Sequence, residues 1–195
     1  NDTVFAIFPW QVGYFWSYGS PEGPQPELTP DDEWSQSVAT ALDDALSRGR
    51  VWFPMHQSLG AVLENAAEQD LAQGNYQLAN RWYSPSTRLT GWAAPEPAQA
   101  GAGAITALAA FEGGIETEVS YQPRTLSADN DVLPVRLAFA GLDGQHLASL
   151  RLTSPDGRIW AQRDVTLDQD GVQQVGLLAP AGMPAGRYDL KLSLA

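Results

Sequence analysis

Residues 93–104 read AAPEPAQAGAGA and separate two regions of different composition. Fourteen of the nineteen aromatic residues, among them six of the seven tryptophans, lie before Pro95. The side chains of residues 93–104 offer little to bury, and a change of composition across such a stretch is typical of a domain boundary. We therefore predict a domain over residues 1–94, a linker over 95–104 and a second domain over 105–195.

The composition is that of a globular and acidic protein. Of the 195 residues, 44% are hydrophobic and 17% are charged, and the formal net charge is −12. Nucleic acid and anionic lipid both attract basic surfaces, so this charge argues against either as a partner. The absence of cysteine excludes disulfides, thiolate zinc sites and cysteine nucleophiles. No apolar run approaches the ~20 residues of a membrane helix. The chain starts at Asn1, so we expect targeting information upstream.

The first region alternates patterns typical of strands and helices. Apolar runs predict strands at 4–8, 50–54, 76–83 and 88–92, and a proline-rich loop at 19–30. We expect one helix to start at Thr29 as N-cap, with Pro30 in its first position, Trp34 on its apolar face and Gly49 at its end. A second helix is expected over 58–72, followed by Gly74, with these residues facing inward: Leu59, Val62, Leu63, Ala66 and Leu71. The pattern predicts a small three-layer α/β domain with partly parallel strands.

The second region consists of short runs with alternating polarity. They cover residues 115–121, 132–139, 147–153, 158–164, 172–178 and 187–194. Turn signals rich in Asp, Gly and Pro separate them at 142–144, 154–157, 168–171 and 184–186. Six or seven strands at this spacing predict an immunoglobulin-like antiparallel β-sandwich.

The residues that could support catalysis or bind a metal are few. His56 and His146 are the only histidines and lie in different regions. His56 follows a predicted strand, where α/β folds place ligands, so a hydrolase that uses it is one hypothesis. A structural hydrogen bond at the strand end is the interpretation that we favour. No catalytic residue is predicted.

Several acidic and glycine-rich groups have ordinary structural explanations. Calcium needs about six to eight oxygen ligands in a defined loop, and no such pattern is present, so we predict neither a metal nor a cofactor. The acidic groups lie at turns, at a helix start or on a solvated helix face, and residues 101–103 lack the lysine and glycine spacing of a phosphate loop. The groups concerned are Asp129 and Asp131; Asp164, Asp168 and Asp170; residues 31–33; and Asp43 and Asp44.

The aromatic residues of the first region are the most open signal. Five of them between Trp10 and Tyr18 are too dense to be buried on one strand face. We favour the interpretation that large rings fill a thin core. Alternatives are a groove in which rings stack on sugars, and a contact with a membrane interface or with the rest of a larger protein. The candidate ligand-binding residues are Trp10, Tyr14, Trp16, Trp52, His56, Arg81, Trp82 and Arg88.

Short segments in both regions resemble one family. Residues 8–15 (FPWQVGYF), 50–57 (RVWFPMHQ) and 81–89 (RWYSPSTRL) are similar to the extracytoplasmic tail of large bacterial membrane glycosyltransferases. These are enzymes of the dolichyl-phosphate-mannose protein mannosyltransferase and aminoarabinose transferase group. Residues 131–137 (DVLPVRL), 154–158 (SPDGR), 161–164 (AQRD) and 184–188 (PAGRY) resemble the β-sandwich appended to some of them.

The resemblance implies a polytopic parent that transfers a sugar from a polyprenyl-phosphate donor. The family's catalytic acidic residue lies in an early loop between membrane helices, and no position here matches that loop. We therefore expect a non-catalytic extracytoplasmic accessory region, attached through an upstream membrane part, that packs on this part or binds a glycan or protein acceptor. The alternative is a freestanding carbohydrate- or protein-binding module, secreted or tethered at the surface.

Overall fold

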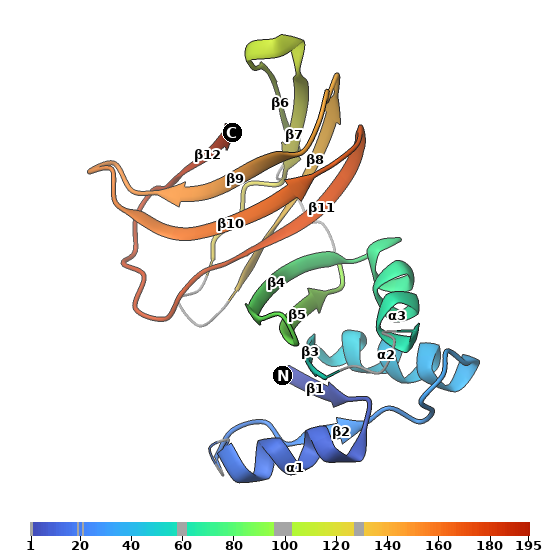
Figure 1. Cartoon of the computed structure of the whole chain (residues 1–195). Helices are drawn as coiled ribbons and strands as arrows, with labels where there is room; N and C mark the ends of the chain where they lie inside the picture. The colour runs from blue at the N-terminus through green and yellow to red at the C-terminus, as the bar shows by residue number, and fades with distance from the viewer. Residues whose placement is uncertain (1, 19, 21, 58–61, 96–102, 127–130) are drawn as a thin grey trace. The chain divides into compact units, whose positions relative to one another are not determined.

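A computed structural model describes all residues except 1, 19, 21, 58–61, 96–102 and 127–130 (Figure 1). The chain divides into two compact units, Asn1–Pro95 and Glu96–Ala195, and each is described by itself. Most of the predicted linker, at residues 96–102, lies outside the described residues. The mixed α/β character expected of the chain is confirmed, with strands predominating over three α-helices.

In its described residues, the first unit combines three helices with a mixed sheet of five strands. Its strand order is β2-β1-β3-β5-β4. The strands β2, β1 and β3 run parallel, and β3, β5 and β4 run antiparallel, as expected for a partly parallel sheet. The elements are β1 (Asp2–Ala6), α1 (Pro9–Tyr18), β2 (Pro26–Leu28), α2 (Gln36–Arg48), β3 (Arg50–His56), α3 (Val62–Ala72), β4 (Tyr76–Ser84) and β5 (Thr87–Ala93).

The start of α2 differs from the prediction. Ser35, not Thr29, is the N-cap, and its side chain accepts a hydrogen bond from the Val38 amide at 3.3 Å. The Thr29 amide instead donates to the Ala6 carbonyl at 2.9 Å, continuing the pairing of β2 with β1. Strand pairing therefore takes Thr29, and residues 30–34, Trp34 included, lie before the helix begins. The end of α2 at Gly49 is as predicted, since the Gly49 amide donates to the Ala45 carbonyl.

Helix α1 was not predicted, and neither was strand β2 within the expected loop. Pro9 occupies the first position of α1, where its missing N–H costs nothing. The Gln11 side chain folds back and accepts hydrogen bonds from the amides of Ile7 and Phe8 at 2.8 and 3.1 Å. A local cap made by a glutamine therefore ends β1 before residues 7 and 8, which were expected to be part of the strand.

The core of the first unit lies between one face of the sheet and the helices α2 and α3. Along β3, Val51, Phe53 and Met55 are buried and alternate with half-buried residues, as a strand covered mainly on one face requires. In α3, Leu63 and Leu71 point inward as predicted, whereas Val62 is exposed. The predicted start of this helix at 58–61, including Leu59, lies outside the described residues. The buried cluster comprises Phe5, Ile7, Val38, Leu42, Ala45, Leu46, Val51, Phe53, Met55, Leu63, Ala67, Leu71 and Trp92.

The described residues of the second unit form seven strands in antiparallel pairs. Its strand orders are β11-β8-β7-β6 and β10-β9-β12. Each of the six predicted runs forms a strand, and β6 is an additional one. The strands are β6 (Ile105–Ala110), β7 (Glu116–Tyr121), β8 (Val132–Ala140), β9 (His146–Thr153), β10 (Ile159–Leu167), β11 (Gly171–Leu178) and β12 (Asp189–Leu194), and a short 3₁₀ turn at Glu112–Gly114 joins β6 to β7.

A hydrophobic core holds the two sets of strands of the second unit together. Its buried residues come from β7, β8 and β11 of one set, from β9 and β10 of the other, and from Ile115 just before β7. Val135, Leu137 and Leu150 are fully buried, so the alternation read from the sequence corresponds to one core-facing side of each strand.

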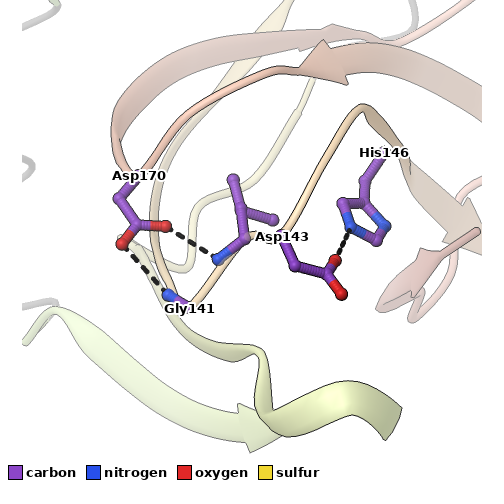
Figure 2. A network of polar contacts seen from close by, with 5 residues as sticks. Gly141, Asp143, His146 and Asp170 are labelled. Atoms are coloured by element: carbon purple, nitrogen blue, oxygen red, sulfur yellow. Dashed lines mark hydrogen bonds and ion pairs between the residues drawn. The ribbon is translucent and has the colours of Figure 1, made fainter.

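The loop between β8 and β9 is held by an acidic residue of the β10–β11 turn (Figure 2). The Asp170 carboxylate accepts hydrogen bonds from the amides of Gly141 and Leu142 at 3.1 and 2.8 Å. These bonds lower the pKa of the Asp170 carboxyl, the Leu142 amide more than the Gly141 amide. In the same loop, Oδ1 of Asp143 lies 3.0 Å from Nε2 of His146. Asp170 thus has a structural role in joining two loops.

Candidate functional site

The hairpin β4–β5 positions three of the eight candidate residues. Arg81 pairs with Leu89, and Trp82 pairs with Arg88. Because successive residues of a strand point to opposite faces, Arg81 and Trp82 lie on opposite faces of the hairpin. Register shifts at 77/79 and 82/84 mark irregularities near both ends of β4. The candidates of this hairpin therefore form two groups and not one.

The first group lies on the face that α3 covers. Nη2 of Arg88 lies 2.9 Å from Oε1 of Glu68 on α3, and its Nε donates to Oδ1 of Asn80 at 2.9 Å. The guanidinium also lies 5.4 Å from the centre of the Trp82 ring. Burial raises the pKa of the Glu68 carboxyl, and Arg88 opposes this shift by its charge and its hydrogen bond. Arg88 is thus committed to a partly buried ion pair and orients Trp82.

The second group lies on the opposite face of the sheet, the face of Arg81, and includes candidates of β3, which pairs with β5. His56 pairs with Thr87, and its Nδ1 lies 2.8 Å from Oγ1 of Thr87. The Tyr14 ring of α1 meets the imidazole edge-on, with the ring centres 4.9 Å apart. Nε2 of His56 is buried and forms no hydrogen bond with the described residues. This environment matches a histidine that joins α1 to the sheet.

Trp52 lies on this second face and rests on a glycine. It pairs with Gly91, and a β-carbon on Gly91 would stand 2.5 Å from two carbons of the indole ring. The ring is half-buried. Trp52 is therefore held against the sheet, with less of its surface available to a ligand than the exposed tryptophans have.

The tip of the hairpin carries a shallow hollow of about 470 Å³ lined by Trp82, Tyr83, Ser84 and Pro85. Trp82 and Tyr83 are each 59% exposed. The Arg81 guanidinium lies 4.9 Å from the centre of the Tyr83 ring. The Gln57 amide donates to the Ser86 carbonyl at 2.9 Å, which places the end of β3 beside the tip. We call Arg81 and these four lining residues the hairpin-tip patch.

The remaining candidates lie on α1. The Trp10 ring stacks on Phe8 with the ring centres 4.3 Å apart and the planes nearly parallel. Trp16 is 74% exposed and Trp10 and Tyr14 are also exposed. The side chain of Tyr18 lies outside the described residues. The interpretation that these rings fill a core is therefore wrong for Trp10, Tyr14 and Trp16.

The structure brings the candidates together only in pairs. Tyr14 contacts His56, and Trp82 contacts Arg88. Sequence reasoning missed Glu68, the ion-pair partner of Arg88, and Tyr83, which lies next to Arg81 on the hairpin tip. Tyr83 follows Trp82 in the region already noted for its many aromatic residues, so the density of aromatic residues could have indicated Tyr83. Glu68 gave no signal, since its partner depends on how α3 packs.

The acidic groups do not assemble a metal site in the part of the chain that the structure describes, where no cluster of three potential ligands occurs. Asp31 accepts a hydrogen bond from the Ser35 hydroxyl, just before α2. Asp129 and residues 101–102 lie outside the described residues. Asp170 binds backbone amides, as described above.

Comparison with known proteins gives no match for this chain, whether to a family model, a curated protein or a solved structure. Within the described residues, no helix is both long and apolar enough to cross a bilayer. The function is therefore argued from the site itself.

Proposed function

We propose that the chain is a non-catalytic region of a membrane glycosyltransferase that binds the glycan of the acceptor, and that the hairpin-tip patch makes the first contact. The observation that carries the proposal is the hollow at the tip, which the exposed rings of Trp82 and Tyr83 line. Arg81 lies on the other face from Trp82 and adjoins the hollow through its contact with the Tyr83 ring. The attachment to a membrane enzyme rests on the sequence resemblance described above.

An exposed tryptophan leaves apolar surface in water that a contact could bury. Burying a large apolar side chain stabilises a protein by roughly 1.5–3 kcal/mol, and that gain is absent for the exposed part of Trp82 and Tyr83. An aromatic face can pack against the C–H face of a sugar ring, while a guanidinium offers up to five donors to hydroxyl or carboxylate oxygens. Both chemistries meet at the hairpin tip, where Arg81 lies beside Tyr83.

The environment of His56 supports a structural role over a hydrolytic one. Its Nδ1 is engaged by Thr87, and its Nε2 is buried. No carboxylate among the described residues forms an ion pair with it, so the third member of a catalytic triad is missing there. The hydrolase hypothesis predicts that His56→Ala abolishes activity, and unchanged hydrolysis would exclude it.

The second unit fits an immunoglobulin-like sandwich, and we include this in the proposal. The chain changes from one set of strands to the other after β8, after β10 and after β11. Such crossings between two packed antiparallel sheets are typical of Greek-key sandwiches. A unit of this kind serves as a rigid spacer or as a further binding surface.

The test is a panel of soluble glycans, neutral and acidic, titrated against the chain while intrinsic tryptophan fluorescence is followed. We expect Trp82→Ala and Arg81→Ala each to weaken binding by about tenfold, which corresponds to ~1.4 kcal/mol. Trp34→Ala is the matched control, because Trp34 is also exposed but lies outside the patch. Equal losses in the control, or no binding across the panel, would contradict the proposal.

The alternative, a freestanding carbohydrate- or protein-binding module, uses the same exposed rings. Sequencing of the gene upstream of Asn1 separates the two hypotheses: several apolar spans of about 20 residues support the membrane enzyme, and a lone signal peptide or single anchor supports the module. Binding of the chain to neutral lipid vesicles but to no glycan would instead favour a membrane-resting surface.

A further inference from the structure

Strand β12 has an open edge. Its one strand neighbour among the described residues is β9. Ala195 and Leu147 exchange two backbone hydrogen bonds, of 2.8 and 3.1 Å, in register with this pair. In an antiparallel ladder, residue pairs that are hydrogen-bonded to each other alternate with pairs whose backbone N–H and C=O groups point away from the partner strand. The N–H and C=O groups of Leu190, Leu192 and Leu194 therefore point to the open edge.

The side chains of these three leucines are incompletely covered. Each packs against the core of the second unit but remains half-exposed, while the residues between them are exposed. Unpaired backbone groups beside uncovered apolar side chains are the conditions under which a further strand is added to a sheet.

A groove of about 920 Å³ runs beside the start of β12. On one side it is lined by residues 183–188 and the first residues of β12, and on the other by residues 123–126 after β7. Core residues Leu133 and Leu152 form part of its lining. Its volume is in the range of pockets that hold ligands, and its apolar lining would accept side chains.

The groove is basic in an acidic unit. Arg187 and Lys191 line it together with one carboxylate, Asp189, and with Arg124, whose side chain has an interaction of its own. Lys191 is the only lysine of the chain. The unit as a whole has seven basic and twelve acidic residues, which gives a net charge of −5. An anionic occupant is therefore favoured at the groove and repelled elsewhere.

We propose that an extended acidic peptide segment binds here, pairing with β12 as an additional strand. Its backbone groups bond with those of Leu190, Leu192 and Leu194. Its alternate apolar side chains cover the leucines and enter the groove, and its acidic side chains meet Lys191 and Arg187. This site lies in the second unit, so its test is independent of the hairpin-tip patch.

The test uses fluorescently labelled eight-residue peptides and the full 195-residue chain, with binding followed by anisotropy at low salt. A peptide of alternating valine and glutamate is expected to bind at least about tenfold more tightly than one of alternating valine and lysine. Binding should weaken in high salt, because exposed charges are screened. Equal affinity for both peptides, or no binding of either, would overturn the proposal.

Strand pairing is tested separately from charge. Two further valine–glutamate peptides are methylated on alternate backbone nitrogens, one at the valines and the other at the glutamates, so that the protein itself is not altered. The peptide whose methylated nitrogens would face β12 should lose binding. Leu192→Pro removes one donor of the open edge without removing a bond to β9, and it should also weaken binding. If both methylated peptides bind like the parent peptide, strand addition is excluded.

Variants of the cations complete the design. Arg187→Glu combined with Lys191→Glu is expected to reverse the peptide preference, whereas Lys191→Arg keeps the charge and should leave it unchanged. Inorganic phosphate is the probe for a simple anion site. If phosphate at about 10 mM displaced the peptide at high salt, where long-range charge effects are screened, the peptide proposal would be wrong.

Discussion

The indole ring of Trp52 lies so close over Gly91 that a methyl group on the glycine would stand 2.5 Å from two ring carbons. The two residues are opposite each other on β3 and β5. Gly91→Ala must therefore displace the ring or the strands. We expect it to reduce the free energy of unfolding by about 1–3 kcal/mol, the usual cost of overpacking. Urea denaturation and the tryptophan emission spectrum measure both effects.

Gly13→Ala is the control for this substitution. Gly13 lies within α1, and a β-carbon there would meet no atom within 4 Å. Alanine favours a helix interior over glycine by roughly 0.5–1 kcal/mol, so this variant should be slightly more stable. If Gly91→Ala were equally harmless, the contact between Trp52 and Gly91 would not restrict the strand pair.

The ion pair of Arg88 with Glu68 makes a prediction that depends on pH. Burial raises the pKa of Glu68, so the folded state holds its proton more tightly than the unfolded chain. The stability that this provides is full below the usual pKa of a glutamate and is lost as the pH rises through the raised value. Arg88 limits this loss of stability because its charge and its hydrogen bond stabilise the ionised carboxylate of Glu68. Arg88→Met should therefore destabilise the chain by about 1–3 kcal/mol at neutral pH and by less near pH 4.

The double variant Arg88→Met with Glu68→Gln isolates the charge. With no carboxylate left at position 68, most of the loss at neutral pH should be recovered. Denaturation at both pH values measures it. If Arg88→Met lost the same stability at both pH values, and if the double variant recovered none of it, Arg88 would act through its packing on Trp82.

The sequence predicted six strands of the second unit because apolar residues that face the core alternate along them. Val135, Leu137 and Phe139 are buried, and their neighbours are not, so the alternation of β8 was visible in the residues. Strand β6 has every residue exposed and therefore shows no alternation. It could be recognised only from its pairing with β7.

Helix α1 and the site could not be predicted for two different reasons. The residues of α1 are mostly apolar around the helix, without a polar face to mark its period, and its cap is the unusual side chain of Gln11. The division of the candidates between two faces depends on the pairing of β4 with β5 and its irregularities. The residue types near Trp82 predict neither the register of β4 with β5 nor the contact of Arg88 with Glu68.

The N-cap of α2 gives a direct test of the corrected helix start. Ser35→Ala removes the hydrogen bond to the Val38 amide and should cost about 1 kcal/mol. Thr29→Val should cost less or stabilise, since the Thr29 hydroxyl is buried without a hydrogen-bond partner among the described residues. Thermal unfolding of both variants measures the difference. A larger loss of stability for Thr29→Val than for Ser35→Ala would indicate that Thr29 is the N-cap, as the sequence predicted.

Asp170 predicts how the second unit responds to acid. The amides of Leu142 and Gly141 lower the pKa of its carboxyl in the folded state. Stability from this group is therefore present above the usual pKa of an aspartate and is lost as the pH falls through the lowered value. Asp170→Asn should lower Tm at neutral pH, because a neutral oxygen is a weaker acceptor, and should flatten the decline of Tm in acid. Asp168→Asn, exposed on the same turn, is the control and should leave Tm unchanged. If Asp170→Asn followed the unmodified chain across the acid range, the two hydrogen bonds drawn in Figure 2 would not contribute to stability.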